Sequence, residues 1–127
     1  MQVVIDTNII VSALINPSGA CFMFLDRVLS GTYDVVVSEP IMVEYNEVLR
    51  RPRFGFDEED IEFLVDWFYS NALMVEVNED DYKTDAVIDE KDMPFYITAK
   101  ATKSRLVTGN VKHYPVEEMR TMIWELF

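Results

Sequence analysis

Short runs of β-branched apolar residues, each ending in polar residues, constrain the fold of this chain more than any other feature. Val3–Ile5 lead directly into Asp6. Val35–Val37 lead into Ser38 in the same way. Because the apolar residues do not alternate with polar ones, they indicate strands that are covered on both faces, as in parallel sheets. Parallel neighbours need crossover connections, so the pattern predicts an α/β fold with helices between the strands.

The segments between these runs have the apolar spacing of helices. We expect helices over residues 7–15, 20–29, 40–49, 57–72 and 94–104. We expect further strands over residues 73–77, 105–108 and 121–124. Strands that alternate with helices are typical of a three-layer α/β/α sandwich with a central parallel sheet. The length of 127 residues suits a single domain over residues 1–127.

The net charge of −12 is concentrated in one segment. Residues 57–92 contain 14 acidic residues and two lysines, a balance of −12, so the remaining nine acidic and nine basic residues cancel. The total therefore does not exclude nucleic acid as a partner, although such partners usually meet basic surfaces. Arg50, Arg51 and Arg53 form a compact basic group, for which a solvated face and a phosphate-binding track both stay open.

The apolar residues favour a soluble protein. No apolar run approaches the roughly 18 residues of a membrane span, and the amino terminus lacks the pattern of a signal peptide. We therefore expect a cytoplasmic protein without a membrane partner. Cys21 is the only cysteine, which excludes an internal disulfide, and its aromatic neighbours predict a core thiol.

The aspartate at the end of the first strand has two interpretations. Ligands of open α/β sheets bind outside the carboxyl ends of the strands, where Asp6 stands. Asp is also a preferred residue at the start of a helix, so Asp6 can equally be a helix cap. Other polar residues favour a site: Glu44 lies in the helix after the second strand, Asp92 opens the helix before the fourth strand, and Asn110 follows that strand. Converging carboxylates repel one another unless a hard cation such as Mg²⁺ or Mn²⁺ lies between them.

Four blocks follow one another along nearly the whole chain. They are VVIDTNIIVSALINPSG, VVVSEPIMVEYNEVLRRPRF, DEKDMPFYITAKA and RLVTGNVKHYP. In order and spacing they resemble the successive blocks of the PIN-domain nucleases, a superfamily of metal-dependent ribonucleases that includes many toxins of prokaryotic toxin–antitoxin pairs. The resemblance implies a PIN-like fold and a cytoplasmic, Mg²⁺- or Mn²⁺-dependent endoribonuclease that hydrolyses RNA phosphodiester bonds.

The resemblance also implies roles for individual residues. Asp6, Glu44 and Asp92 resemble the three invariant acids, which act as catalytic residues and metal ligands. The supporting positions of the family are matched by Thr7, Asn8, Asp89 and Thr108. Asn110 stands at a catalytic position where many members have Asp. An amide oxygen can still coordinate a cation but brings no negative charge, so we expect weaker binding of a second metal.

The partners follow from the same resemblance. It implies RNA as substrate, a cognate antitoxin and a homodimer. The alternative is a catalytically weak RNA- or protein-binding module, which Asn110 and the acidic segment favour. Phe63, Trp67 and Phe68 have helical spacing and predict core packing rather than base stacking. For the apolar residues of 54–56 and 63–69, a dimer or antitoxin surface and core packing stay equally open.

Overall fold

A five-stranded parallel sheet forms the centre of the computed structural model, which describes residues 1–78, 90–109 and 120–122. The strands are β1 (Gln2–Ile5), β2 (Asp34–Ser38), β3 (Leu73–Val75), β4 (Arg105–Thr108) and β5 (Arg120–Met122). Their order across the sheet is β3-β2-β1-β4-β5, and every neighbouring pair is parallel. The predicted parallel sheet is therefore confirmed.

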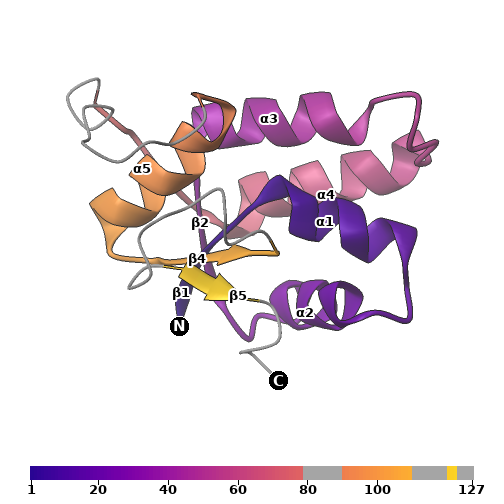
Figure 1. Ribbon diagram of the computed structural model, residues 1–127, viewed down its shortest axis with the longest axis horizontal. Coiled ribbons are helices and arrows are strands. Elements are labelled where there is room, and N and C mark those ends of the chain that lie inside the picture. The colour runs from indigo at the N-terminus through magenta and orange to yellow at the C-terminus, as the bar shows by residue number, and fades with distance from the viewer. Residues whose placement is uncertain (79–89, 110–119, 123–127) are drawn as a thin grey trace.

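Helices cover both faces of this sheet. They are α1 (Thr7–Ile15), α2 (Ala20–Leu29), α3 (Glu39–Leu49), α4 (Glu58–Asn71) and α5 (Met93–Thr102), and a short 3₁₀ helix, η2 (Glu90–Asp92), precedes α5. Figure 1 shows α5 on one side of the sheet and α1, α2 and α4 on the other. The chain passes from β1 to β2 to β3 in one direction across the sheet and then crosses back to β4 on the other side of β1. Because crossovers are right-handed, connections that run in opposite directions place their helices on opposite faces of the sheet. The three-layer α/β/α arrangement is thus confirmed.

The core lies between these layers. Val3, Val4 and Ile5 of β1 are fully buried, as are Val36 and Val37 of β2. Consecutive strand residues point to opposite faces, so this unbroken burial shows that both faces are covered. Burial of both faces is the physical reason that polar and apolar residues do not alternate along these strands.

Most element bounds agree with the prediction, and the differences have local causes. The expected helix over residues 94–104 ends at Thr102, because Lys103 takes a left-handed conformation with φ of 55° that closes the helix. The expected strand over residues 73–77 covers only three residues. The strand expected over 121–124 begins at Arg120, and residues 123 and 124 lie outside the described residues.

The packing of α4 corrects one prediction. Phe68 is buried and Trp67 is half-buried, but Phe63 is 60% exposed. The buried face of α4 is formed by Ile61, Leu64, Val65 and Phe68. Phe63 falls outside this stripe, so the prediction that it packs in the core is wrong.

Among the described helices, none alone is long and apolar enough to cross a membrane, whereas α1 and α2 reach that length only as a pair bent by 109°.

Candidate active site

The carboxyl ends of β1 and β4 bring two polar residues together. β1 and β4 are parallel neighbours with Ile5 opposite Val107, so Asp6 and Thr108 come next at the same edge of the sheet. Asp6 is 3% exposed and Thr108 is fully buried. The hydroxyl Oγ1 of Thr108 donates a hydrogen bond of 2.8 Å to Oδ2 of Asp6. This contact orients the carboxylate at the end of the strand.

Asp6 stands at the start of α1 without capping it. Its side chain forms no capping hydrogen bond with the helix. The same is true of Asp92, which precedes α5 and is also buried. The interpretation of Asp6 as a helix cap is therefore wrong. Both carboxylates lie at helix amino termini, where the helix dipole stabilises negative charge.

The helix that follows Asp92 is held against the end of β2. Thr98 on α5 donates a hydrogen bond of 3.1 Å from its hydroxyl to the hydroxyl oxygen of Ser38, the last residue of β2. Both side chains are buried. Because β2 and β1 are parallel neighbours, this bond brings α5 to the edge of the sheet at which Asp6 lies.

Tyr45 joins α3 to the end of β1. Its fully buried phenol donates a hydrogen bond of 2.5 Å to the carbonyl oxygen of Ile5, the residue before Asp6. Its ring also packs against Phe68, with centroids 5.2 Å apart. Burial, followed by the charge of Asp6, raises the pKa of Tyr45 well above its ordinary value, so the phenol stays protonated and keeps its proton to donate. This contact holds Glu44, the preceding residue, near the end of β1.

The pKa of Glu44 reports the charges around it. Burial is the largest cause that raises this pKa, and repulsion from Glu47 comes next. The charge of Arg51 lowers it, while Asp92 and Asp6 raise it further. The carboxylate of Glu44 on α3 is therefore close enough to Asp92, at the start of α5, and to Asp6, at the end of β1, to be repelled by both.

The oxygen donors of this site suit Mg²⁺ or Mn²⁺. Within the described ranges, no three His, Cys, Asp or Glu side chains lie close enough to hold a metal ion by themselves. Mg²⁺ does not require three, because it keeps several waters and commonly takes one or two carboxylates. The carboxylates available at this end of the sheet are those of the buried Asp6 and Asp92 and of the half-buried Glu44. A divalent cation would also relieve their mutual repulsion.

The other predicted residues fall into two groups. Thr7 is buried, and its Oγ1 has no hydrogen-bond partner in the described part of the chain, while Asn8 is exposed. Asp89 and Asn110 lie outside the described residues. The role of Tyr45 does not follow from the motifs in the sequence, although one signal is present: a tyrosine on the apolar face of a helix needs a partner for its hydroxyl once it is buried.

The arginines after α3 differ in their contacts. Nη2 of Arg50 lies 2.8 Å from Oε1 of Glu58, and Nη2 of Arg51 lies 3.3 Å from Oε1 of Glu47. These two arginines are therefore partly neutralised by acids. The guanidinium of Arg53 instead lies over the ring of Phe54, 4.8 Å from its centroid.

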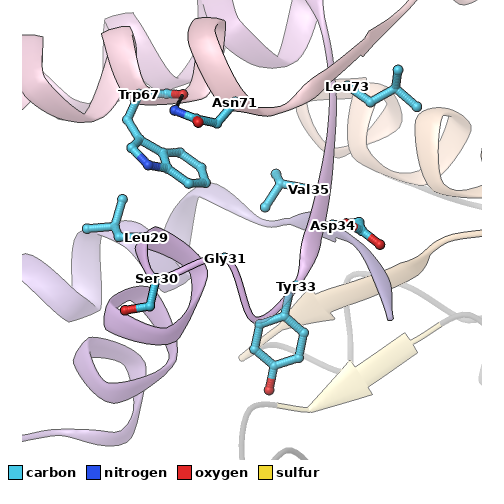
Figure 2. Close-up of a pocket in the computed structure, with 9 residues that line it drawn as sticks. All are labelled: Leu29, Ser30, Gly31, Tyr33, Asp34, Val35, Trp67, Asn71 and Leu73. Carbon is cyan, nitrogen blue, oxygen red and sulfur yellow. Dashed lines mark hydrogen bonds between the residues drawn. The ribbon is translucent and has the colours of Figure 1, made fainter.

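A cavity of about 440 Å³ lies at the other edge of the sheet (Figure 2). Leu29, Trp67 and Val35 contribute to its wall, together with Asp34, the first residue of β2. Since β2 runs from Asp34 to Ser38, the cavity and the carboxylates lie at opposite ends of the strand. The cavity is therefore separate from the candidate active site.

Comparisons with known proteins agree on the fold. The family model described as PIN domain matches residues 2–112. In the solved structure of VapBC2 from Rickettsia felis bound to a DNA fragment from their promoter, one chain is similar with a TM-score of 0.64 and 18% identity, covering 96% of this chain and 98% of that chain. In the structure of VapBC-1 from nontypeable Haemophilus influenzae, one chain is similar with a TM-score of 0.66 and 20% identity, covering 98% of this chain and 99% of that chain. No curated protein matches the sequence significantly.

Proposed function

Because this chain belongs to the PIN-domain family, we propose that it is an Mg²⁺- or Mn²⁺-dependent endoribonuclease that hydrolyses RNA phosphodiester bonds. The observation that carries the proposal is the grouping of acids at the carboxyl edge of the sheet. Asp6 and Asp92 are buried at helix starts that they do not cap, and their charges raise the pKa of Glu44. Their repulsion of Glu44 is a cost to folding that a divalent cation bound between these carboxylates would relieve.

Each residue has a distinct part in this proposal. Asp6 and Asp92 hold the cation, and Glu44 adds a third carboxylate at the more exposed side of the site. Thr108 keeps the Asp6 carboxylate oriented through its hydrogen bond. A divalent cation bound here supplies Lewis-acid polarisation of a phosphoryl oxygen and a bound water of lowered pKa. Asn110 is proposed as a fourth catalytic residue on the strength of its sequence position alone.

We further propose that the chain is the toxin of a toxin–antitoxin pair. The two similar structures are both of VapBC, which supports a cognate antitoxin as partner. A homodimer and a cytoplasmic location stay predictions from the sequence.

The alternative is a PIN-like module that binds RNA or protein and cuts weakly. Two observations favour it. Asn110 replaces an acid, and no trio of described side chains is close enough to hold a metal unaided. This module would bind RNA or a partner protein whether or not a divalent cation is present.

Cleavage of a mixed single-stranded RNA pool tests both functions. The wild type is compared with Asp6→Asn and Asp92→Asn in Mg²⁺, in Mn²⁺ and in EDTA. Asp66→Asn, a change of an exposed aspartate on α4, serves as the matched control. We expect metal-dependent cutting that falls at least about 100-fold in the two site variants, since loss of a residue that stabilises the transition state commonly costs that much. Cutting should be unchanged in Asp66→Asn.

Two results would decide against the nuclease. Absence of cutting with either metal, while RNA still binds, would support the binding module. Cutting that survives both substitutions would remove Asp6 and Asp92 from the site.

A further inference from the structure

The loop between α3 and α4 carries a stack of two aromatic rings and a guanidinium. The rings of Phe54 and Phe56 are nearly parallel, with an interplanar angle of 9° and centroids 5.3 Å apart. The guanidinium carbon of Arg53 lies 4.8 Å from the centroid of Phe54. Gly55, between the two phenylalanines, has φ of +63°, which residues with a Cβ rarely adopt. The loop geometry that stacks the rings therefore depends on glycine at this position.

Arg53 is the arginine of this loop that acids do not neutralise. Arg50 and Arg51 pair with Glu58 and Glu47, whereas Arg53 forms no ion pair with any described residue. Phe54 and Phe56 are half-buried and pack against the core, while Arg53 is exposed. The guanidinium of Arg53 thus packs over the ring of Phe54 while the residue as a whole stays exposed to solvent.

The loop lies within reach of the candidate active site. α3 carries Glu44 and leads directly into the loop (Figure 1). Arg51 follows Glu44 by seven residues, a rise of about 10 Å along a helix. Its charge also lowers the pKa of Glu44. About three nucleotides at the stacked spacing of ~3.4 Å cover the same length. An RNA strand that is cut at the acids therefore reaches the start of this loop, two residues before Arg53, within a few nucleotides.

We propose that Arg53, supported from behind by Phe54 and Phe56, is the platform on which an unpaired base of the RNA substrate stacks, an assignment that rests on the proposed nuclease function. Unpaired bases stack on guanidinium planes and on aromatic rings, and the guanidinium also attracts the neighbouring phosphates. The exposed guanidinium of Arg53 forms no ion pair with a described residue, so its charge is available to a phosphate group. RNA suits this surface better than an apolar protein partner, because both rings are half-buried and the guanidinium is the exposed group.

Binding in EDTA tests the platform separately from cleavage. The dissociation constant of a fluorescent single-stranded RNA is measured by anisotropy for the wild type, Arg53→Lys and Phe54→Leu. Lysine keeps the charge and loses the planar stacking surface. Arg27→Lys on α2 is the matched control, since it makes the same chemical change outside the loop. We expect the dissociation constant to rise about tenfold in Arg53→Lys and to stay within about twofold in the control. Thermal melting shows that each variant is folded.

A set of RNAs that each lack one base locates the contact. In the wild type, removal of one particular base should weaken binding about tenfold. For Arg53→Lys, the RNA that lacks this base should have the same dissociation constant as the complete RNA, because the substitution and the missing base delete the same interaction. The dissociation constant of Phe54→Leu should lie between those of the wild type and Arg53→Lys, because the arginine remains but loses the ring against which it packs.

Three results would overturn the platform: equal affinity of wild type and Arg53→Lys, an undiminished sensitivity of Arg53→Lys to the missing base, or no RNA binding by the wild type. A fourth result, weaker binding of a protein partner at unchanged RNA affinity, would also overturn it and would assign Arg53 to a protein contact. The nuclease is judged separately. Absence of cutting in Mg²⁺ and Mn²⁺ refutes the proposed function, whereas RNA binding that depends on Arg53 still upholds the platform.

Discussion

At the residue scale, two hydroxyl groups organise the carboxyl end of β1. Thr108 donates to the Asp6 carboxylate, and Tyr45 donates to the carbonyl of Ile5 just before it. The first contact orients a candidate metal ligand directly. The second sets the distance between β1 and α3, and therefore between Asp6 and Glu44. Neither hydroxyl needs to touch the substrate to influence the reaction.

Tyr45→Phe tests this positioning role. The change removes the bond to Ile5 and keeps the ring packing, so we expect a loss of about 1 to 3 kcal/mol in the free energy of unfolding, because a buried carbonyl loses its partner. We also expect kcat to fall more than the affinity for RNA does. Urea unfolding and steady-state cleavage measure the two effects. Tyr33→Phe is the control, since the hydroxyl of Tyr33 makes no hydrogen bond within the described residues and its ring packs against Phe24. A stability loss with unchanged kcat would limit Tyr45 to a structural role.

At the element scale, Gly55 and Lys103 both take left-handed backbone conformations, but only the glycine is a residue type suited to one. Gly55 has φ of +63° in the loop after α3, and Lys103 has φ of 55° at the end of α5. A Cβ at Gly55 would meet no atom within 4 Å, so an alanine there would suffer backbone strain without a clash. Lys103 already carries that strain. The residue at the end of α5 is therefore less well suited to its backbone conformation than the glycine in the loop after α3.

Gly55→Ala and Lys103→Gly should change stability in opposite directions. The alanine variant should lose about 1 to 2 kcal/mol, the cost of a left-handed conformation for a residue with a Cβ. The glycine variant should gain about 0.5 kcal/mol, because the relief of that strain exceeds the added entropy of an unfolded glycine. Urea unfolding measures both. Gly55→Ala should also weaken RNA binding, since it disturbs the stack of Phe54 and Phe56. A stable Gly55→Ala variant would contradict the backbone argument.

At the scale of the whole molecule, negative charge is the dominant property. The net charge is −12, and the candidate site adds buried carboxylates to a chain that is already acidic. Asp6, Glu44 and Asp92 are far apart in the sequence, and it is folding that brings Glu44 within reach of the charges of the two aspartates. Stability of the whole chain should therefore respond to metal ions and to pH at this site.

Thermal unfolding of wild type and Glu44→Gln tests that response. The pKa of Glu44 is raised in the folded state, first by burial and then by nearby carboxylates. A raised pKa stabilises the folded state below the ordinary carboxyl value of about 4.3, and this contribution is lost as the pH rises through the folded pKa. In EDTA at pH 7 we therefore expect Glu44→Gln to melt at a higher temperature than the wild type, with the difference vanishing near pH 4.

Adding Mn²⁺ should reverse this order, because the wild type gains more from a bound cation than the variant that lacks one carboxylate. Glu62→Gln, an exposed change on α4, serves as control and should show neither effect. Equal melting temperatures of Glu44→Gln and wild type at every pH would contradict the raised pKa of Glu44.

The sequence by itself determined the class of the fold and the carboxyl ends of β1 and β4. Unbroken β-branched runs require cover on both faces, so a parallel sheet between helices follows from local pattern alone. The positions of Asp6 and Thr108 at strand ends follow for the same reason. Residues whose role depends on their neighbours along the chain can be assigned in this way.

Only the tertiary structure decided which contacts those residues make. Helical spacing alone did not distinguish the exposed Phe63 from the buried Phe68, and nothing near Asp6 in sequence showed that its carboxylate receives a hydrogen bond from Thr108 instead of capping α1. The partners of Tyr45 and Ser38 lie 40 and 60 residues away. Contacts of this kind depend on how α3 and α5 pack against the sheet, which is set by the sum of many buried side chains and not by any local pattern.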